Sequence, residues 1–235
     1  MTGLWTALLH SAEAEHNDEG YAGYLARART RRGVAQTIME FLVLWGGPST
    51  ARAFPLDGRK GTERNLARWY RLYHGRIDRL AKAKITDSDL KSFAPDIGDL
   101  FDSLRRLPQP KVGGKDRTFG STGAGKALHL LLPDLCPIWD EEVVRSPLGL
   151  DEQAWSYLWL LRLEREILRR ISEESRRADL EETVGAIVDA HRASVRGAEV
   201  PAREPVTKII DEALYNPSFR SRARSLAAGF ASLPW

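Results

Sequence analysis

Apolar residues recur at spacings of three and four along almost the whole chain, which is the period of a helix with one buried face. The pattern is visible at 4–9, 21–25, 38–45, 66–80, 127–132, 155–167, 180–188 and 209–214. No segment of useful length alternates apolar and polar residues as a half-buried strand does. The sequence therefore predicts an all-α fold of about eight to ten helices.

Glycine and proline mark the expected connections between these helices. A loop is expected from Gly46 to Gly61, and Gln109 to Gly125 is the most loop-like stretch of the chain. Pro95 is expected to break or restart the helix between Asp87 and Leu107, because proline lacks the N–H that a helix interior uses. The length, 235 residues, suits a single domain over residues 1–235.

The composition excludes several classes of protein. Cys136 is the only cysteine, which excludes a disulfide framework and any multi-cysteine zinc or iron–sulfur site. No apolar run approaches the roughly 20 residues that cross a bilayer, and no signal peptide is recognisable. We expect a cytoplasmic monomer that does not bind membranes, with Cys136 as a buried thiol.

Positive charge is concentrated in particular segments, although the net charge of the chain is only +3. Between Arg52 and Lys84 there are ten basic and three acidic residues. This stretch also contains Trp69 and Tyr70. Basic residues interleaved with aromatic ones are typical of a surface that binds phosphates and stacks on bases. The alternative is a solvated helix face whose aromatic side chains point into the core.

The glycine-rich segment from Gly120 to Lys126 matches the G-x-x-x-x-G-K part of a nucleotide-binding loop. Ala127 stands where serine or threonine would hold magnesium, and no apolar strand precedes the segment. These features argue against nucleotide hydrolysis. Gly123 and Gly125 could instead make a tight turn between two helices, with backbone N–H groups that bind a phosphate.

Downstream of these glycines, Asp140 follows the apolar pair Ile138-Trp139 at the expected start of a helical turn. Val143 and Arg145 come next. A glycine turn followed by an apolar helix and an aspartate resembles the helix-hairpin-helix (HhH-GPD) DNA glycosylases. The resemblance covers about one-tenth of the chain, from Thr122 to Arg145.

This resemblance implies two lobes around a cleft, divided near 46–62 and 197–205, with a helix-hairpin-helix element at about 112–145. It implies that double-stranded DNA is the partner and that no metal is needed. The residues expected to bind the DNA backbone are Gly123, Gly125, Lys126, Lys115, Arg117 and Arg145. The residues expected to line the base pocket or stack on bases are Trp139, Trp45, Trp69 and Tyr70, with core packing as the alternative for Trp139 and Trp69.

The implied reaction is hydrolysis of the bond between a flipped base and its sugar, which leaves an abasic site. A carboxylate near C1′ stabilises the oxocarbenium-like sugar or orients the attacking water, and Asp140 is the candidate. The alternative for Asp140 is an N-cap. Lys126 is a candidate phosphate contact or an amine nucleophile. The Schiff-base lysine of lyase-competent members aligns with Ala127, so a monofunctional glycosylase is expected.

The sequence leaves the excised base open. Two roles are considered: base-excision repair, and antiviral defence against hypermodified phage bases such as glucosylated hydroxymethylcytosine. Two other classes of function also remain open. One is a helical DNA-binding module without catalysis, and the other is a helical protein-interaction domain.

Overall fold

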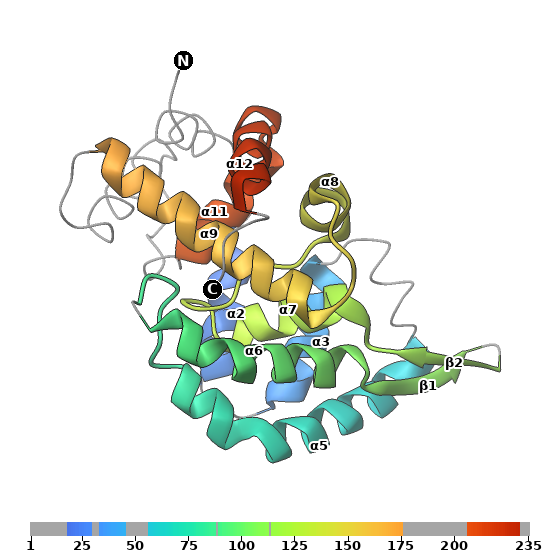
Figure 1. Cartoon of the computed structure of the whole chain (residues 1–235). Coiled ribbons are helices and arrows are strands. Elements are labelled where there is room, and N and C mark those ends of the chain that lie inside the picture. The colour runs from blue at the N-terminus through green and yellow to red at the C-terminus, as the bar shows by residue number, and fades with distance from the viewer. Residues whose placement is uncertain are drawn as a thin grey trace.

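The computed structural model describes residues 18–29, 33–45, 56–87, 89–112, 114–175 and 206–230. These residues are mostly helical, as the sequence predicts (Figure 1). The helices are α2 (Asp18–Arg29), α3 (Val34–Trp45), α5 (Leu56–Leu80), α6 (Leu90–Arg105), α7 (Gly120–Leu131), α8 (Ser146–Leu148), α9 (Ala154–Ser175), α11 (Val206–Tyr215) and α12 (Pro217–Phe230). The other elements are strand β1 (Pro108–Val112), strand β2 (Lys115–Thr118) and a π-helical turn, η1 (Glu141–Arg145).

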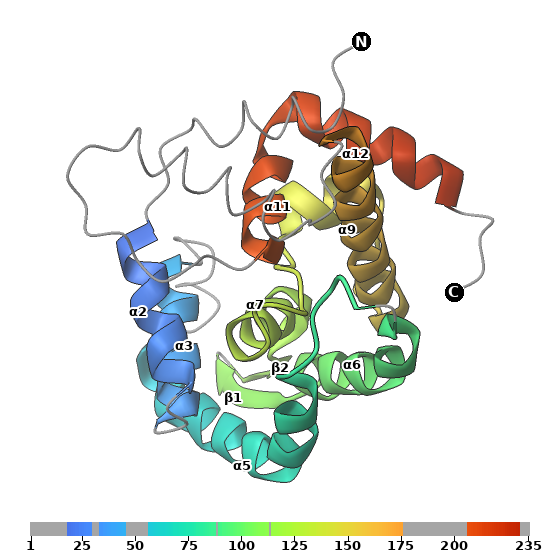
Figure 2. The ribbon, with the colours of Figure 1, turned by 90° about the vertical axis from the view of Figure 1, so that its left-hand side faces the viewer.

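Helix α7 lies at the centre of the fold, where α2, α3 and α6 pack against it (Figure 2). Its sequence, GSTGAGKALHLL, carries small or apolar side chains on every face, which is typical of a helix buried all round. Every residue from Gly123 to Leu130 is buried. Lys126 and His129 are therefore polar side chains inside the core, and such groups need partners there.

Several predicted helices are confirmed, with changes at their ends. Helix α3 ends at Trp45, as expected, whereas α5 begins at Leu56 and so extends into the predicted 46–61 loop. Pro95 lies inside α6 without ending it, so the predicted break is wrong. Pro95 lies in the second turn of α6, so the helix continues past a residue that has no N–H to donate to the preceding turn.

The stretch from Gln109 to Gly125, expected to be the most loop-like, instead contains most of an antiparallel hairpin of β1 and β2, together with the start of α7. The hairpin packs on the N-terminal half of α5. Asn65 Nδ2 donates a hydrogen bond of 2.7 Å to the Pro108 carbonyl. A Cβ on Gly61 would lie 2.4 Å from Pro110 Cγ, so glycine is needed there for the close approach. The pairing depends on this contact with a distant helix rather than on an alternating sequence pattern.

The predicted glycine turn at Gly123 and Gly125 is wrong, since both residues lie inside α7. The turn that precedes the helix is at Gly120, whose φ of +79° favours glycine. The other two glycines permit close packing: Phe119 covers Gly123, and Trp139 lies against Gly125. The described residues therefore contain no helix-hairpin-helix turn at these glycines.

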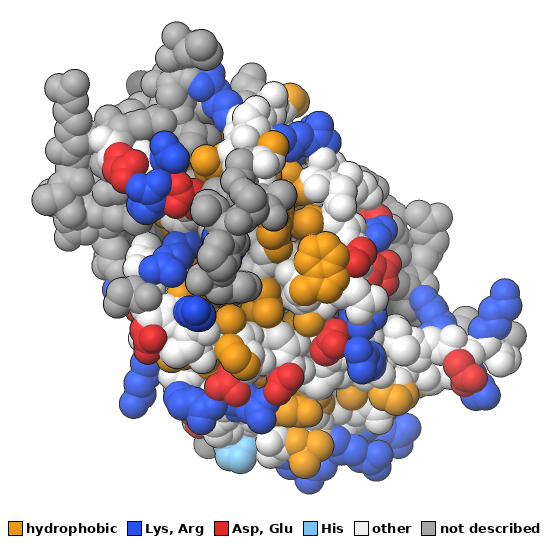
Figure 3. Space-filling view, viewed as in Figure 1, with side chains coloured by type: hydrophobic (Ala, Val, Ile, Leu, Met, Phe, Trp, Pro, Cys, Tyr) orange, Lys and Arg blue, Asp and Glu red, His pale blue; other side chains and the backbone are white. Residues whose placement is uncertain are grey.

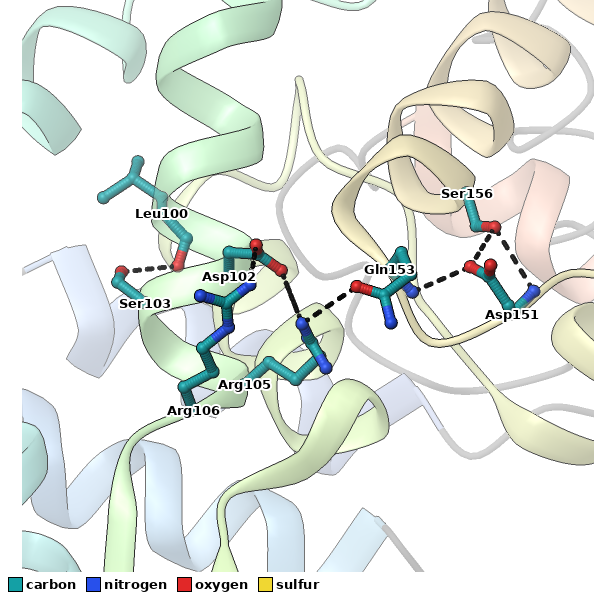
Figure 4. Close-up of polar contacts among 8 residues, drawn as sticks. All are labelled: Leu100, Asp102, Ser103, Arg105, Arg106, Asp151, Gln153 and Ser156. Atoms are coloured by element: carbon teal, nitrogen blue, oxygen red, sulfur yellow. Dashed lines mark hydrogen bonds and ion pairs between the residues drawn. The ribbon is translucent and has the colours of Figure 1, made fainter.

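A chain of polar contacts joins the C-terminal end of α6 to the start of α9 (Figure 4). Arg105 binds Asp102 on its own helix at 3.0 Å and donates to Gln153 Oε1 at 3.2 Å. Asp151 Oδ1 accepts from the Gln153 N–H and from the Ser156 hydroxyl, which caps the first turn of α9. These contacts fix α9 relative to the core.

Some predictions lie outside the described residues. They are the helices expected at 4–9 and 180–188, most of the 46–61 loop, the 197–205 connection and the side chain of Trp45. Within the described ranges, no helix combines the length and apolar character that crossing a membrane would require.

Candidate functional site

Lys126 and Asp140 form an ion pair in which the Lys126 Nζ and Asp140 Oδ2 atoms are 3.2 Å apart. Lys126 comes from the middle of the central helix α7, and Asp140 from the segment that leads into η1. Their side chains are 9% and 17% exposed, so the pair is largely shielded from water but still reaches the surface. An ion pair that is desolvated to this degree attracts more strongly than one on the open surface.

Backbone hydrogen bonds present Asp140 at the start of the π-helical turn. Its carbonyl oxygen accepts from the N–H groups of Val144, at 3.1 Å, and of Arg145, at 2.9 Å. The predicted start of a helical turn after Asp140 is confirmed, but the turn is π-helical. Single π-helical turns are rare and are frequently found at functional sites.

The segment between α7 and η1 is held from two further helices. The Thr207 hydroxyl of α11 donates to the Pro133 carbonyl, and the Tyr157 hydroxyl of α9 donates to the Pro137 carbonyl at 3.0 Å. Trp139 is fully buried, and its ring contacts Phe101 edge-on with 5.8 Å between centroids. These contacts fix the backbone on which Asp140 is carried.

Helix α11 brings a second lysine and a second aspartate to the pair. Asp211 is buried, and it interacts electrostatically with Lys208, Asp140 and Lys126. The pKa of Asp211 is raised to about 7, because the effect of burial, together with that of the neighbouring Asp140, outweighs the lowering by Lys208 and Lys126. Asp211 Oδ1 has no hydrogen-bond partner among the described residues.

A third carboxyl group, Glu164 of α9, completes this buried cluster. It is 0% exposed, and neither of its carboxyl oxygens has a hydrogen-bond partner within the described ranges. Burial, together with the neighbouring Asp211, raises the pKa of Glu164 well above its usual value. Burial disfavours the charged form of a carboxyl group, so the protonated form of Glu164 is the favoured one.

His129 lies one turn along α7 from Lys126 and is neutral as well. Its Nδ1–H donates to the Cys136 carbonyl at 2.8 Å, which leaves Nε2 to accept from the Tyr21 hydroxyl. Burial lowers the pKa of His129 to about 3. The Lys208 ammonium lies 5.4 Å from the centre of the Tyr21 ring. Cys136 is buried, as predicted, and burial raises its pKa to about 12.

The structure corrects several expected contacts with the DNA backbone. Gly123 and Gly125 are buried inside α7, and the largely buried Lys126 is paired with Asp140, so none of the three lies on an open surface. The Arg145 guanidinium is bound by Glu141 and lies 3.7 Å from Glu152, which offsets its charge. The phosphate contacts expected at Gly123 and Gly125 depended on a turn between two helices, and both residues lie inside a continuous helix instead.

Other predicted basic residues do lie on the surface. Lys115 is exposed and Arg117 half-buried on β2. Blue side chains follow the hairpin and the lower edge of the molecule, where α5 lies (Figure 3). We call four exposed side chains on one face of α5 the basic face: Lys60, Arg64, Arg68 and Arg71.

The expected stacking residues belong mainly to the core. Trp139 is 0% and Trp69 3% exposed, so neither ring offers a face to a base. The indole N–H of Trp69 donates to Ser103 Oγ at 2.8 Å, and Tyr70 is half-buried against the core. For Trp139 and Trp69, the core alternative is the one that the structure supports.

Three residues of the cluster were not anticipated: Lys208, Asp211 and Glu164. The sequence did contain a signal for two of them. Asp211 shares a helix face with Ile210 and Leu214, and Glu164 occupies the apolar stripe of α9. A charged residue on a buried stripe marks a polar site within the core.

Among the described residues, no group of three or more His, Cys, Asp and Glu side chains could hold a metal ion. A scan against protein-family models finds no match for the chain. Searches of curated proteins and of solved structures find no match either. The resemblance to helix-hairpin-helix glycosylases therefore rests on residues of this chain, of which Lys126 and Asp140 lie together in space.

Proposed function

We propose that this protein is a DNA glycosylase that excises a modified base from double-stranded DNA. The observation that carries the proposal is the shielded ion pair between Lys126 Nζ and Asp140 Oδ2, 3.2 Å apart at the start of a π-helical turn. Asp140 is the aspartate that the resemblance implies to be catalytic. Its shielding supports the proposal, because a carboxylate stabilises a developing cation best where water is excluded.

In the proposed reaction, the bond between C1′ and the base nitrogen lengthens, and its electron pair leaves with the base. The Asp140 carboxylate stabilises the positive charge that develops at C1′. Water then supplies a hydroxyl group to C1′ and a proton to the base, so that free base and an abasic site are formed. Lys126 orients the carboxylate through the ion pair. The excised base stays open between a repair substrate and a hypermodified phage base.

DNA binding is proposed at the basic face and at Lys115 and Arg117 of the hairpin. The four side chains of the basic face recur at spacings of four, four and three, so they lie along one side of α5. Such a row can follow a phosphate backbone. This surface by itself also supports a second candidate function, a DNA-binding module without catalysis.

The test is to incubate the protein with duplexes that carry damaged, normal or phage-modified bases, and to identify released bases by mass spectrometry. Asp140→Asn is expected to abolish release and to retain DNA binding. Asp134→Asn is the matched control, because Asp134 is an exposed aspartate in the same connection. Binding without release from any substrate would favour the DNA-binding module, and normal release by Asp140→Asn would refute the catalytic role of Asp140.

The role of Lys126 is tested separately by trapping with borohydride. Because Lys126 lies beside Asp140 rather than on the surface, the trapping experiment can distinguish an orienting lysine from an amine nucleophile. The monofunctional proposal expects no covalent adduct between protein and DNA. An adduct that Lys126→Arg eliminates would show that the lysine attacks C1′.

A further inference from the structure

Asp211 is a buried acid that the reaction proposed above does not use. Only 4% of the residue is exposed, and its Oδ1 atom has no hydrogen-bond partner among the described residues. Leaving a buried carboxyl oxygen without a partner is costly to folding. Asp211 interacts electrostatically with both members of the Lys126–Asp140 pair, so its charge acts on that pair.

Charged and titratable groups face Asp211 from four parts of the fold. Lys208 lies on its own helix, Lys126 comes from α7, Asp140 precedes η1, and Glu164 comes from α9. His129, also on α7, interacts with Lys208 but stays neutral. Each of these groups except Asp140 is itself buried.

The charges of this cluster balance only when Asp211 is ionised. With Glu164 and His129 neutral, two lysines stand against Asp140 and Asp211, and the net charge is zero. When Asp211 takes up a proton, one positive charge is left unbalanced beside Asp140. A buried site responds strongly to such a change, because little water is present to screen it.

We propose that Asp211 is a positioning residue of this site, whose buried carboxyl group sets the charge around the Lys126–Asp140 pair according to whether it carries a proton. Its role in base excision rests on the function proposed above, whereas its electrostatic coupling to the pair does not. In the ionised form, Asp211 competes with Asp140 for Lys126. In the protonated form, Asp140 alone faces Lys126.

The coupling is tested by carbon-13 NMR of protein labelled at aspartate carboxyl groups, with the Asp211 signal assigned through its own backbone. In the wild type, the Asp211 carboxyl is expected to titrate at about pH 7. Lys126→Met removes a positive charge and should raise the midpoint by about one pH unit, and Asp140→Asn should lower it by a similar amount. Asp99→Asn, at an exposed residue paired with Arg76, should leave the midpoint unchanged.

The opposite directions expected for Lys126→Met and Asp140→Asn distinguish coupling from a general change in packing. A wild-type midpoint below pH 5 would overturn the inference, even if neither variant folds. The inference would also be overturned if the Asp211 carboxyl titrated with the same midpoint in the wild type and in both variants, provided that the variants fold.

A second measurement connects the titration to function. The rate of base release by the wild type should change near pH 7, and Asp211→Asn should remove that change while Asp99→Asn keeps it. If the midpoints move as expected but no base is released, the proposed function fails and the coupling stands. If base is released and the midpoints do not move, the function stands and the role of Asp211 is refuted.

Discussion

Trp139 packs directly against Gly125 of α7. A Cβ atom on Gly125 would lie 2.1 Å from the Trp139 Cβ and 3.1 Å from the Trp139 backbone nitrogen. Neither atom can move like the end of a flexible side chain, because Trp139 is fully buried and its own backbone is in the contact. Since Trp139 precedes Asp140, this contact also restricts the backbone from which the Asp140 side chain extends.

Gly125→Ala is therefore expected to lower the free energy of unfolding by at least about 1–3 kcal/mol, the usual cost of overpacking a core. Urea denaturation measures the change. The matched control is Gly75→Ala on α5, where a Cβ would meet nothing within 4 Å. That variant should be stabilised by roughly 0.5–1 kcal/mol, because alanine favours a helix interior over glycine. Similar effects of the two substitutions would contradict the close approach of Trp139.

His129→Leu should change how stability depends on pH. The pKa of His129 is about 3 in the folded protein, against 6.5 as the ordinary value, so the unfolded chain takes up a proton below pH 6.5 that the folded protein does not. This histidine therefore costs the wild type about 1.4 kcal/mol of stability between pH 7.5 and 5.5, a loss that His129→Leu avoids.

The effect of His129 is measured as the difference in the free energy of unfolding between wild type and variant. The difference is needed because Asp211 changes stability with pH in the opposite direction. The pKa of Asp211 is raised to about 7, so its contribution to stability increases as the pH falls from 7 towards 3.8. Urea unfolding at the two pH values gives this difference. The control is His74→Leu, at an exposed histidine of α5, whose stability should change with pH as that of the wild type does. If the stability of His129→Leu also changed with pH as that of the wild type does, His129 would not be a buried, neutral histidine.

Glu164→Leu is expected to stabilise the protein by about 1–4 kcal/mol at pH 8, since a buried carboxyl group without hydrogen-bond partners in the described part of the chain is replaced by an apolar side chain. The gain should be smaller at pH 4.5. The folded pKa of Glu164 is raised, so the wild type loses stability as the pH rises above 4.5, whereas the variant does not. Thermal unfolding at both pH values measures the gain.

Glu166→Leu is the control for Glu164→Leu. Glu166 lies on the same helix but forms ion pairs with Arg169 and Arg170 near the surface. Its replacement should change stability by less than about 1 kcal/mol, and in the destabilising direction. A loss of stability in Glu164→Leu larger than that of the control would indicate that Glu164 has a partner.

The double variant Arg64→Gln/Arg68→Gln tests the proposed DNA-binding surface. Each arginine that contacts a phosphate contributes about 0.9 to the slope of log K against log salt, so the slope should fall by about 2. Arg76→Gln/Arg79→Gln is the matched control, because both arginines are already paired with Asp96. Fluorescence anisotropy with labelled duplex at several salt concentrations gives the slopes. Equal slopes in the two double variants would exclude the basic face as the site of DNA binding.

The sequence predicted those features that depend on neighbours along the chain. The apolar period of Ile38, Phe41 and Leu42 indicated α3, and the same reasoning indicated most of α5, α9 and α11. Asp140 was correctly expected at the start of a helical turn. Each of these features is set by spacing within a few residues, which a single sequence displays directly.

The tertiary structure alone decided the use of the glycines and the composition of the site. A glycine serves equally for a turn or for a close approach, and only the position of Trp139 shows that Gly125 serves the second purpose. Lys126 was expected as a phosphate contact or an amine nucleophile, and it lies largely buried beside Asp140. Asp211 joins them from 71 residues further along the chain than Asp140. Contacts over such separations depend on how the helices pack, and no local pattern specifies that packing.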